Sequence, residues 1–282
     1  MRPGPILLAA LLCALVLQLP AVEARPAPEL RFVRFETADG VVRWGRVEGG
    51  DVVPVSGLPW RPHAALPGER MPLESVRLLA PATPTNVIAI GFNYPSHTQD
   101  RPAPTEIGMF AKLPGSVIGP GAPIVIPPDA GNLHYEGELV LVIGRETRNV
   151  SVEDAPKHVF GITAGNDLSE RDWQANDLQW LRAKASDGFG PIGPWIVTGV
   201  DWEELALITR VNGEVKQSDR VENLYFGIPE IVSHVSRYVT LHPGDLIFTG
   251  TPGTTSALKP GDVVEVEIPG VALLRNPVVA PD

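Results

Sequence analysis

Two glutamates separated by one glycine, Glu136 and Glu138, open the most apolar strand-like segment of the chain after its N-terminal apolar run. Residues two apart on an extended strand point to the same face. The two carboxylates therefore repel each other unless a cation lies between them. A third carboxylate, Asp167, follows further along the chain. Oxygen ligands in this number suit Mg²⁺, Mn²⁺ or Ca²⁺ better than zinc, so the pattern predicts a divalent-metal site that does chemistry.

The segment after Asp167 carries polar side chains at helical spacing. If it is helical, Asp167, Arg171 and Gln174 share one stripe of the helix and line one wall of a pocket. The Arg171 guanidinium can then bind a substrate carboxylate through two hydrogen bonds. The alternative, more frequent for such a segment taken alone, is an exposed helix with an ordinary Asp–Arg pair.

A histidine, His97, follows a predicted buried strand, where loops often carry catalytic groups. Asp100 lies three residues on, so one helical turn would let it hold the imidazole in one tautomer and raise its basicity. A lone histidine is more often structural. His134 shares a strand face with both glutamates and competes as a ligand, but three carboxylates already make an oxygen-rich site.

A lysine and a turn complete the candidate site. Lys184 precedes a loop rich in glycine and proline, and alone it would be a solvated charge. Near a metal it can instead neutralise an enolate or contact a bound oxygen. The turn at residues 249–253, which contains Thr251, offers hydroxyls and close backbone N–H groups. No lysine follows where a phosphate loop requires one.

The composition excludes several classes. The chain has 282 residues, and its net charge of -10 argues against a nucleic-acid or anionic-membrane partner. Thirty prolines and 28 glycines indicate many turns and short strands. The one cysteine, Cys13, lies in the N-terminal apolar run. A mature chain without that run would contain no disulfide and no cysteine–zinc site.

Residues 1–24 have the pattern of a secretory signal peptide. Arg2 gives a positive start, residues 6–19 form an apolar run, and a small-residue cleavage site follows. The run is too short for a membrane span and ends at Pro20. We therefore expect a secreted or periplasmic protein. The alternative is an over-extended start codon and a cytoplasmic protein, since the strand pattern begins cleanly at Arg31.

The remaining chain divides into two predicted parts. Residues 30–80 predict a small antiparallel β domain and a proline-rich connector, and residues 84–282 predict the main domain. Helices are expected near Ser151, over 167–180 and over 229–238. The fold class is mainly β (α+β) with helical insertions, not alternating β/α.

Taken together, the motifs resemble those of the fumarylacetoacetate hydrolase family. The match runs from about Val87 to Val279, and residues 31–55 look like the small N-terminal domain that many members carry. The motifs are Asn93-Tyr94-x-x-His97, Glu136-x-Glu138, Asn166-Asp167-x-Ser169-x-Arg171-Asp172-x-Gln174, Lys184-x-x-Asp187, Gly193-Pro194-Trp195 and Thr249-Gly250-Thr251-Pro252.

This resemblance implies a mixed, rolled β-sheet in the catalytic domain, a homodimer, and Mg²⁺ or Mn²⁺ in the pocket. It implies metal ligands at Glu136, Glu138 and Asp167. It implies that His97 is the general base, oriented by Asp100, and that Lys184 stabilises the bound carbonyl or enolate. The implied substrate contacts are Tyr94, Arg171, Gln174 and Thr251.

The implied substrates are 2-oxo acids and β-dicarbonyls. The first hypothesis is a metal-dependent hydrolase that cleaves a C–C bond in an acylpyruvate-like or fumarylacetoacetate-like compound, with water activated by His97. The second is an isomerase or decarboxylase of a 2-oxo dicarboxylate from aromatic catabolism. The third is an exported metal and oxo-acid binding protein that has lost turnover. Many smaller family members have glutamate where this chain has Asp100, which is shorter by about 1.5 Å.

Overall fold

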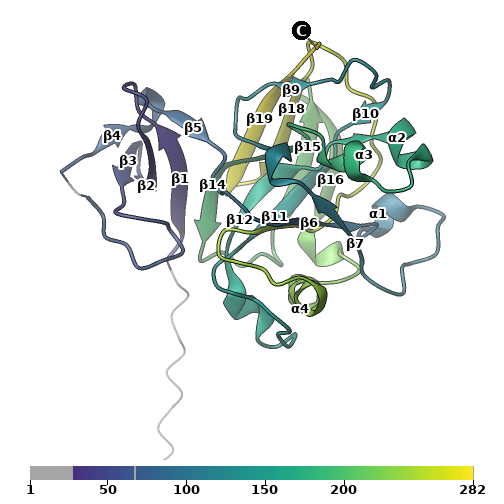
Figure 1. Cartoon of the computed structure of the whole chain (residues 1–282), viewed down its shortest axis with the longest axis horizontal. Coiled ribbons are helices and arrows are strands. Elements are labelled where there is room, and N and C mark those ends of the chain that lie inside the picture. Colours follow the sequence, from purple (N-terminus) through teal and green to yellow (C-terminus); the bar gives the residue numbers. More distant parts are fainter. Residues whose placement is uncertain (1–27, 67, 282) are drawn as a thin grey trace, which may run out of the picture.

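The computed structural model describes residues 28–66 and 68–281 (Figure 1). The predicted signal segment 1–24, with Cys13, lies outside the described residues. Among the helices that are described, none is long and apolar enough to cross a membrane. Strands dominate and the helices are short, which confirms the predicted mainly β (α+β) fold class.

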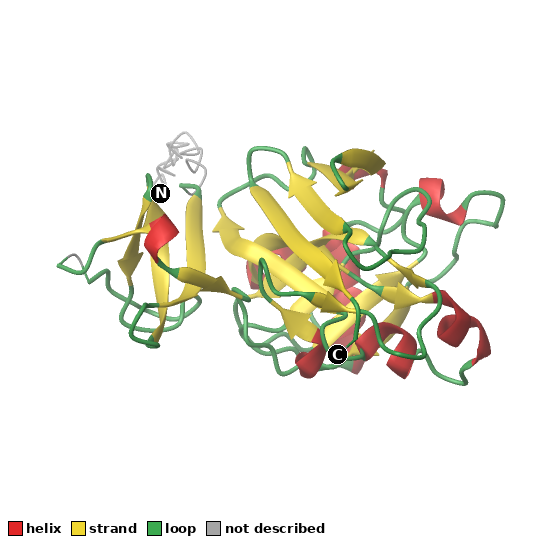
Figure 2. Cartoon of the chain, turned by 90° about the horizontal axis from the view of Figure 1, so that it is seen from above, coloured by secondary structure: helices red, strands yellow, loops and turns green. Residues whose placement is uncertain are grey.

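The first five strands form an antiparallel unit that appears as a lobe beside the rest of the chain (Figures 1 and 2). They are β1 (Leu30–Glu36), β2 (Val42–Glu48), β3 (Asp51–Pro54), β4 (Met71–Pro72) and β5 (Arg77–Leu79). Phe32, Val33 and Phe35 of β1 are buried. β1 also pairs with β14, with Leu30 opposite Thr198. The sheet of the small unit therefore continues into the large sheet.

Two large sheets and one two-stranded sheet, formed by residues 133–134 and 169–170, build the remainder. The larger sheet has the order β4-β3-β2-β1-β14-β12-β11-β17-β6-β7, and the five-stranded sheet has the order β16-β15-β18-β19-β9. Their further strands are β6 (Val87–Gly91), β7 (Gly108–Lys112), β8 (Val117–Ile118), β9 (Ile124–Val125), β10 (Leu133–His134), β11 (Gly137–Ile143), β12 (Val159–Asn166), β13 (Ser169–Glu170), β14 (Gly190–Thr198), β15 (Ala206–Val211), β16 (Glu214–Arg220), β17 (Leu246–Phe248), β18 (Val263–Ile268) and β19 (Ala272–Val279).

Strand β11 is buried along its whole length because both of its faces are covered. Leu139 and Leu141 belong to the core that includes the apolar side chains of β18 and of helix α4 (Ile228–Tyr238). Val140 and Val142 point the other way and pack in a second cluster with Phe248. A strand covered on both faces reads as a continuous apolar run, which explains the sequence pattern after Glu138.

The remaining helices are short and gather on the side away from the N-terminal lobe (Figure 1). They are α1 (Pro95–Thr98), α2 (Arg171–Asn176) and α3 (Leu181–Ala185). Single 3₁₀ turns are η1 (Leu73–Ser75), η2 (Pro114–Ser116), η3 (Ala155–His158) and η4 (Val221–Asn223). The helix predicted over 229–238 is confirmed as α4, and the segment after Ser151 forms η3.

The predicted helix over 167–180 is wrong in its first residues and in its length. Asp167 lies outside a helix, because its backbone N–H donates to the carbonyl of Glu136 at 2.8 Å. The helix starts at Arg171, where the Glu170 carboxylate accepts a hydrogen bond from the backbone N–H of Trp173 at 2.7 Å. Asp167, Arg171 and Gln174 therefore do not share one helical stripe.

Candidate active site

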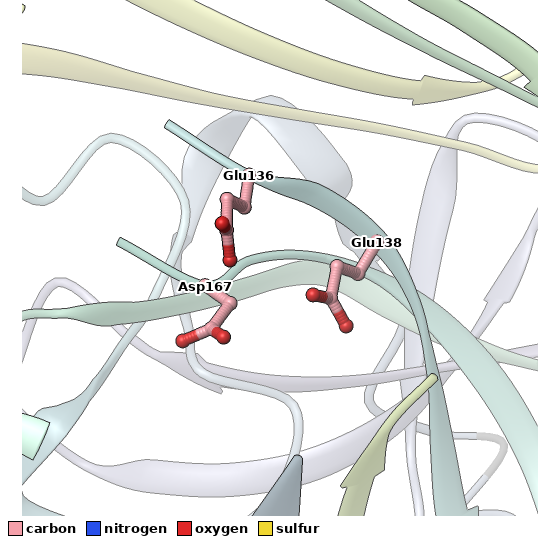
Figure 3. A group of neighbouring side chains, drawn as sticks. All are labelled: Glu136, Glu138 and Asp167. Atoms are coloured by element: carbon pink, nitrogen blue, oxygen red, sulfur yellow. The ribbon is translucent and has the colours of Figure 1, made fainter. Parts of the chain in front are cut away.

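Three carboxylates meet at the base of a cavity of about 500 Å³. The side chains of Glu136, Glu138 and Asp167 point toward one another (Figure 3). One oxygen of each lies within 4.8 Å of the others. All three residues are buried. The structure therefore brings the predicted metal ligands together.

Strand pairing fixes this convergence. Gly137 lies opposite Asn166 in the β11–β12 ladder, so the Glu136 and Asp167 backbones leave the sheet side by side. The side chain of Asn166 accepts the Glu136 N–H at 2.9 Å. A Cβ at Gly137 would lie 1.9 Å from the Thr209 hydroxyl. Only glycine fits between the two glutamates without displacing β15.

Two buried lysines and the partly buried Arg171 contact two of the three carboxylates. The Lys184 ammonium lies 2.6 Å from Glu136 and 2.8 Å from Asp167. Arg171 donates to Glu136 at 2.5 Å. Lys112, which the sequence did not reveal as a site residue, donates to the other oxygen of Asp167 at 2.6 Å and to the backbone carbonyl of Lys184. Its only sequence signal is a charged residue at the end of a short strand before Leu113-Pro114.

These contacts shift the pKa values of Glu136 and Glu138 in opposite directions. Burial by itself would raise the pKa of Glu136, but attraction by Lys184 and Arg171 outweighs burial and lowers it. Glu138 accepts a hydrogen bond from the Gly250 N–H at 2.7 Å. Burial and repulsion by Asp167 and Glu136 raise the pKa of Glu138 well above 4.5.

The lysines are shifted in opposite directions. Burial would lower the pKa of Lys184, but Asp167 and Glu136 outweigh burial and raise it, so this side chain stays charged. Burial lowers the pKa of Lys112 in spite of its contact with Asp167. Lys112 does not line the cavity, so it acts on the site from behind Asp167.

The donor set fits a hard divalent cation. Three carboxylates offer one oxygen each from a common space, and such oxygens suit Mg²⁺ or Mn²⁺. Glu138 is the least compensated of the three, since no lysine or arginine bonds it among the described residues. An added cation would relieve this repulsion and favour the ionised form of Glu138.

His97 of α1 lies beside this group. Its Nδ1 is 2.6 Å from the backbone carbonyl of Gly253, and its Nε2 is 3.9 Å from a Glu136 oxygen. A carbonyl only accepts, so in the neutral ring the proton is on Nδ1. The Nε2 lone pair then carries no proton, and the general-base role of His97 stays a prediction.

The predicted pairing of Asp100 with His97 is wrong in this structure. Helix α1 ends at Thr98, and Gln99 has a φ of 51°, which turns the chain. Asp100 is exposed and does not line the cavity. The Gly253 carbonyl takes the position at Nδ1 that was assigned to the carboxylate.

Tyr94 is also not placed to contact a substrate. It is fully buried, it does not line the cavity, and its hydroxyl has no hydrogen-bond partner among the described residues. Burial raises the pKa of Tyr94 above its usual range, so the phenol stays neutral. Asn93 explains this placement, because its side-chain amide binds the backbone of Phe226 and Thr249 and holds the segment against the core.

The other predicted substrate contacts line the cavity. Arg171 donates to Gln174 at 2.8 Å and to Thr255 at 2.9 Å. The Thr251 hydroxyl donates to the Gly137 carbonyl at 2.8 Å and accepts from Gln217, so it mainly braces β11.

His134 stands apart from the triad. Its ring nitrogens lie 2.8 Å from Thr255 and 2.8 Å from Asn132. Burial and the charge of Arg171 lower its pKa to about 4, so the ring is neutral. The structure therefore agrees with leaving this histidine out of the ligand set.

Comparison with known proteins defines the class. Residues 86–279 match the family model described as fumarylacetoacetate (FAA) hydrolase C-terminal. Residues 30–81 match the model described as Rv2993c-like, N-terminal. The chain belongs to the fumarylacetoacetate hydrolase family.

Three relatives show the range of reactions. The protein of Xenopus laevis named oxaloacetate tautomerase fahd2, mitochondrial, is 35% identical and covers 92% of this chain and 93% of its own. The structure of 2-hydroxyhepta-2,4-diene-1,7-dioate isomerase from Mycobacterium marinum aligns with a TM-score of 0.83 and 40% identity, covering 89% of this chain and 98% of that one. Maleylpyruvate hydrolase from Sphingobium sp. SYK-6, in complex with manganese(II) and pyruvate, aligns with a TM-score of 0.75 and 29% identity, covering 89% and 100%.

The geometry at His97 predicts unequal effects of two substitutions. We expect His97→Gln to lower kcat by on the order of 100-fold or more, since it removes the only imidazole that lines the cavity among the described residues. Asp100→Asn should change kcat by less than about threefold, because an exposed charge without a partner contributes little. Steady-state kinetics of both variants check this. A loss in Asp100→Asn equal to that in His97→Gln would contradict it.

The raised pKa of Glu138 predicts a pH-dependent stability of the metal-free protein. The folded form keeps this proton above pH 4.5, where the unfolded chain loses it. The stabilising contribution is therefore complete below that pH and is lost as pH rises through the raised pKa. We expect wild type to lose up to about 1.4 kcal/mol of unfolding free energy per pH unit in this window.

Urea unfolding between about pH 5 and pH 8 measures this loss in wild type and in Glu138→Gln. The substitution should remove the part of the pH dependence that belongs to Glu138. Saturating Mg²⁺ should flatten the wild-type curve, because the bound cation favours the ionised carboxylate. Parallel curves for the two metal-free proteins would refute the shifted pKa.

Proposed function

We propose that this chain is a divalent-metal-dependent enzyme that moves a proton within a 2-oxo acid, as a tautomerase or isomerase. The observation that carries the proposal is the state of His97, whose Nδ1 is held by the carbonyl of Gly253 and whose Nε2 carries no proton in the neutral ring and lies 3.9 Å from Glu136 at the cavity. An unprotonated Nε2 at the cavity can accept a C–H proton made acidic by adjacent carbonyls.

Each side chain has a role in this reaction. A divalent cation at the three carboxylates would supply Lewis-acid polarisation of the 2-oxo carboxylate. Lys184 uses two of its three N–H donors on Glu136 and Asp167, which leaves one for the oxygen that becomes negative. Arg171 has donors left to hold the substrate carboxylate.

The proton balance closes without another reactant. His97 Nε2 accepts the proton from the carbon next to the carbonyl while negative charge moves to the oxygen beside Lys184. The imidazolium then returns the proton to that oxygen or to a different carbon. The similarity to a tautomerase and to an isomerase, at 35% and 40% identity, supports proton transfer as the first candidate and hydrolysis as the second.

The second candidate is hydrolysis of a C–C bond in an acylpyruvate-like substrate. It is supported by the likeness to maleylpyruvate hydrolase, although at 29% identity. It uses the same carboxylates and requires His97 to activate water. The two reactions differ in their products, so an experiment can separate them.

The test is NMR product analysis in D₂O with Mg²⁺, on a panel of oxaloacetate, acylpyruvates and 2-hydroxydienedioates. We expect an isomerised product with deuterium next to the carbonyl and no cleavage. Glu136→Gln should lower turnover by more than roughly 100-fold. That factor is typical when a residue that only orients a metal ligand is removed. Glu153→Gln, at an exposed position, is the matched control.

Two outcomes would contradict the proposal. Release of pyruvate as the main product, without deuterium exchange, would favour the hydrolase. Binding of Mg²⁺ and oxalate without turnover of any compound would favour the non-catalytic binding protein.

A further inference from the structure

Arg101 is a cation at the cavity whose charge the reaction above does not use. It follows α1, it is exposed, and it lines the same cavity as the carboxylates. Within the described part of the chain, its guanidinium makes no ion pair or hydrogen bond. Its guanidinium carbon lies 5.1 Å from the centre of the Phe92 ring.

This contact leaves the donors of Arg101 available. The aromatic ring is not a conventional hydrogen-bond acceptor, so the contact leaves the five N–H groups of the guanidinium available. The edge can therefore still bind a carboxylate through two parallel hydrogen bonds. The ring also supports the side chain, so less conformational freedom is lost on binding.

Phe92 connects this arginine to the reaction centre. Its φ is 56°, an uncommon conformation for an aromatic residue, and its ring is partly exposed at the cavity. The ring centre lies 6.3 Å from that of His97 and 6.4 Å from that of Trp180. An aromatic wall therefore runs from the imidazole to the guanidinium.

The charges in the cavity are segregated. The acids that line it, among the described residues, are the three carboxylates at the base. Arg171 and Lys184 bond those carboxylates. Among the described residues that line the cavity, Arg101 is therefore a cation that forms no ion pair with an acid.

We propose that Arg101 binds the distal carboxylate of a dicarboxylic substrate and so selects 2-oxo dicarboxylates over 2-oxo acids with a neutral tail. This inference rests on the proposed function, because it takes the first carboxylate to be held at Arg171. A cavity of about 500 Å³ is large enough for a short diacid. The aromatic wall would cover the apolar or unsaturated chain between the two carboxylates.

The test compares a diacid that the protein converts with the monomethyl ester of its distal carboxylate. The two compounds differ only at that carboxylate. Arg101→Met keeps an unbranched apolar stem but removes the guanidinium and its charge. We expect it to raise KM for the diacid by about 10-fold or more, with kcat within about twofold, and to leave the ester unchanged. The KM of Arg101→Lys for the diacid should lie between those of wild type and Arg101→Met, since lysine keeps the charge without the planar guanidinium.

Arg61→Met, at an exposed position of the N-terminal unit, is the matched control and should behave as wild type. Added salt should weaken the preference of wild type for the diacid and have less effect in Arg101→Met. Equal losses on diacid and ester, or no loss on either, would overturn the assignment.

Binding measurements separate this inference from the proposed function. Calorimetric titration of malonate, succinate and their monomethyl esters into the Mg²⁺-loaded protein needs no turnover. If no compound reacts, the proposed function fails, whereas a diacid preference that is lost only in Arg101→Met still supports the role of Arg101. Absence of any diacid preference in wild type contradicts it.

Discussion

Repulsion between three buried carboxylates is the constraint on which the rest of the site depends. Two like charges 4.8 Å apart repel by about 3.5 kcal/mol even at an effective dielectric constant near 20. The summed repulsion of three such pairs is comparable with the whole unfolding free energy of a typical domain, roughly 5–15 kcal/mol. The site can exist only because Lys184, Lys112 and Arg171 are placed against it and because Glu138 can hold a proton until a cation arrives.

The fold supplies the rigidity that such an arrangement needs. β11 is covered on both faces, and its register with β12 brings Glu136 and Asp167 side by side. Thr251 and Gln217 brace the same strand through the Gly137 backbone. Hydrogen bonds attach two residues of the short helices to this frame, His97 of α1 through Gly253 and Arg171 of α2 through Glu136.

The sequence predicted the carboxylates well, because two acids on one face at the start of an apolar strand repel each other unless a cation joins them. It could not predict Lys112, since its partner Asp167 is 55 residues away and only the folded sheet brings them together. The role of Asp100 was inferred from helical spacing, which fails because α1 ends at Thr98. Tyr94 lies in the matched motif, yet the anchoring of Asn93 turns its ring into the core. Export and dimer formation stay predictions.

The central claim is that Glu136, Glu138 and Asp167 together bind one divalent cation. Diffraction from Mn²⁺-soaked crystals, recorded where manganese scatters anomalously, tests it most directly. We predict one strong anomalous peak bonded to an oxygen of each of the three carboxylates. No peak there, or a peak that leaves Glu138 unligated, would contradict it.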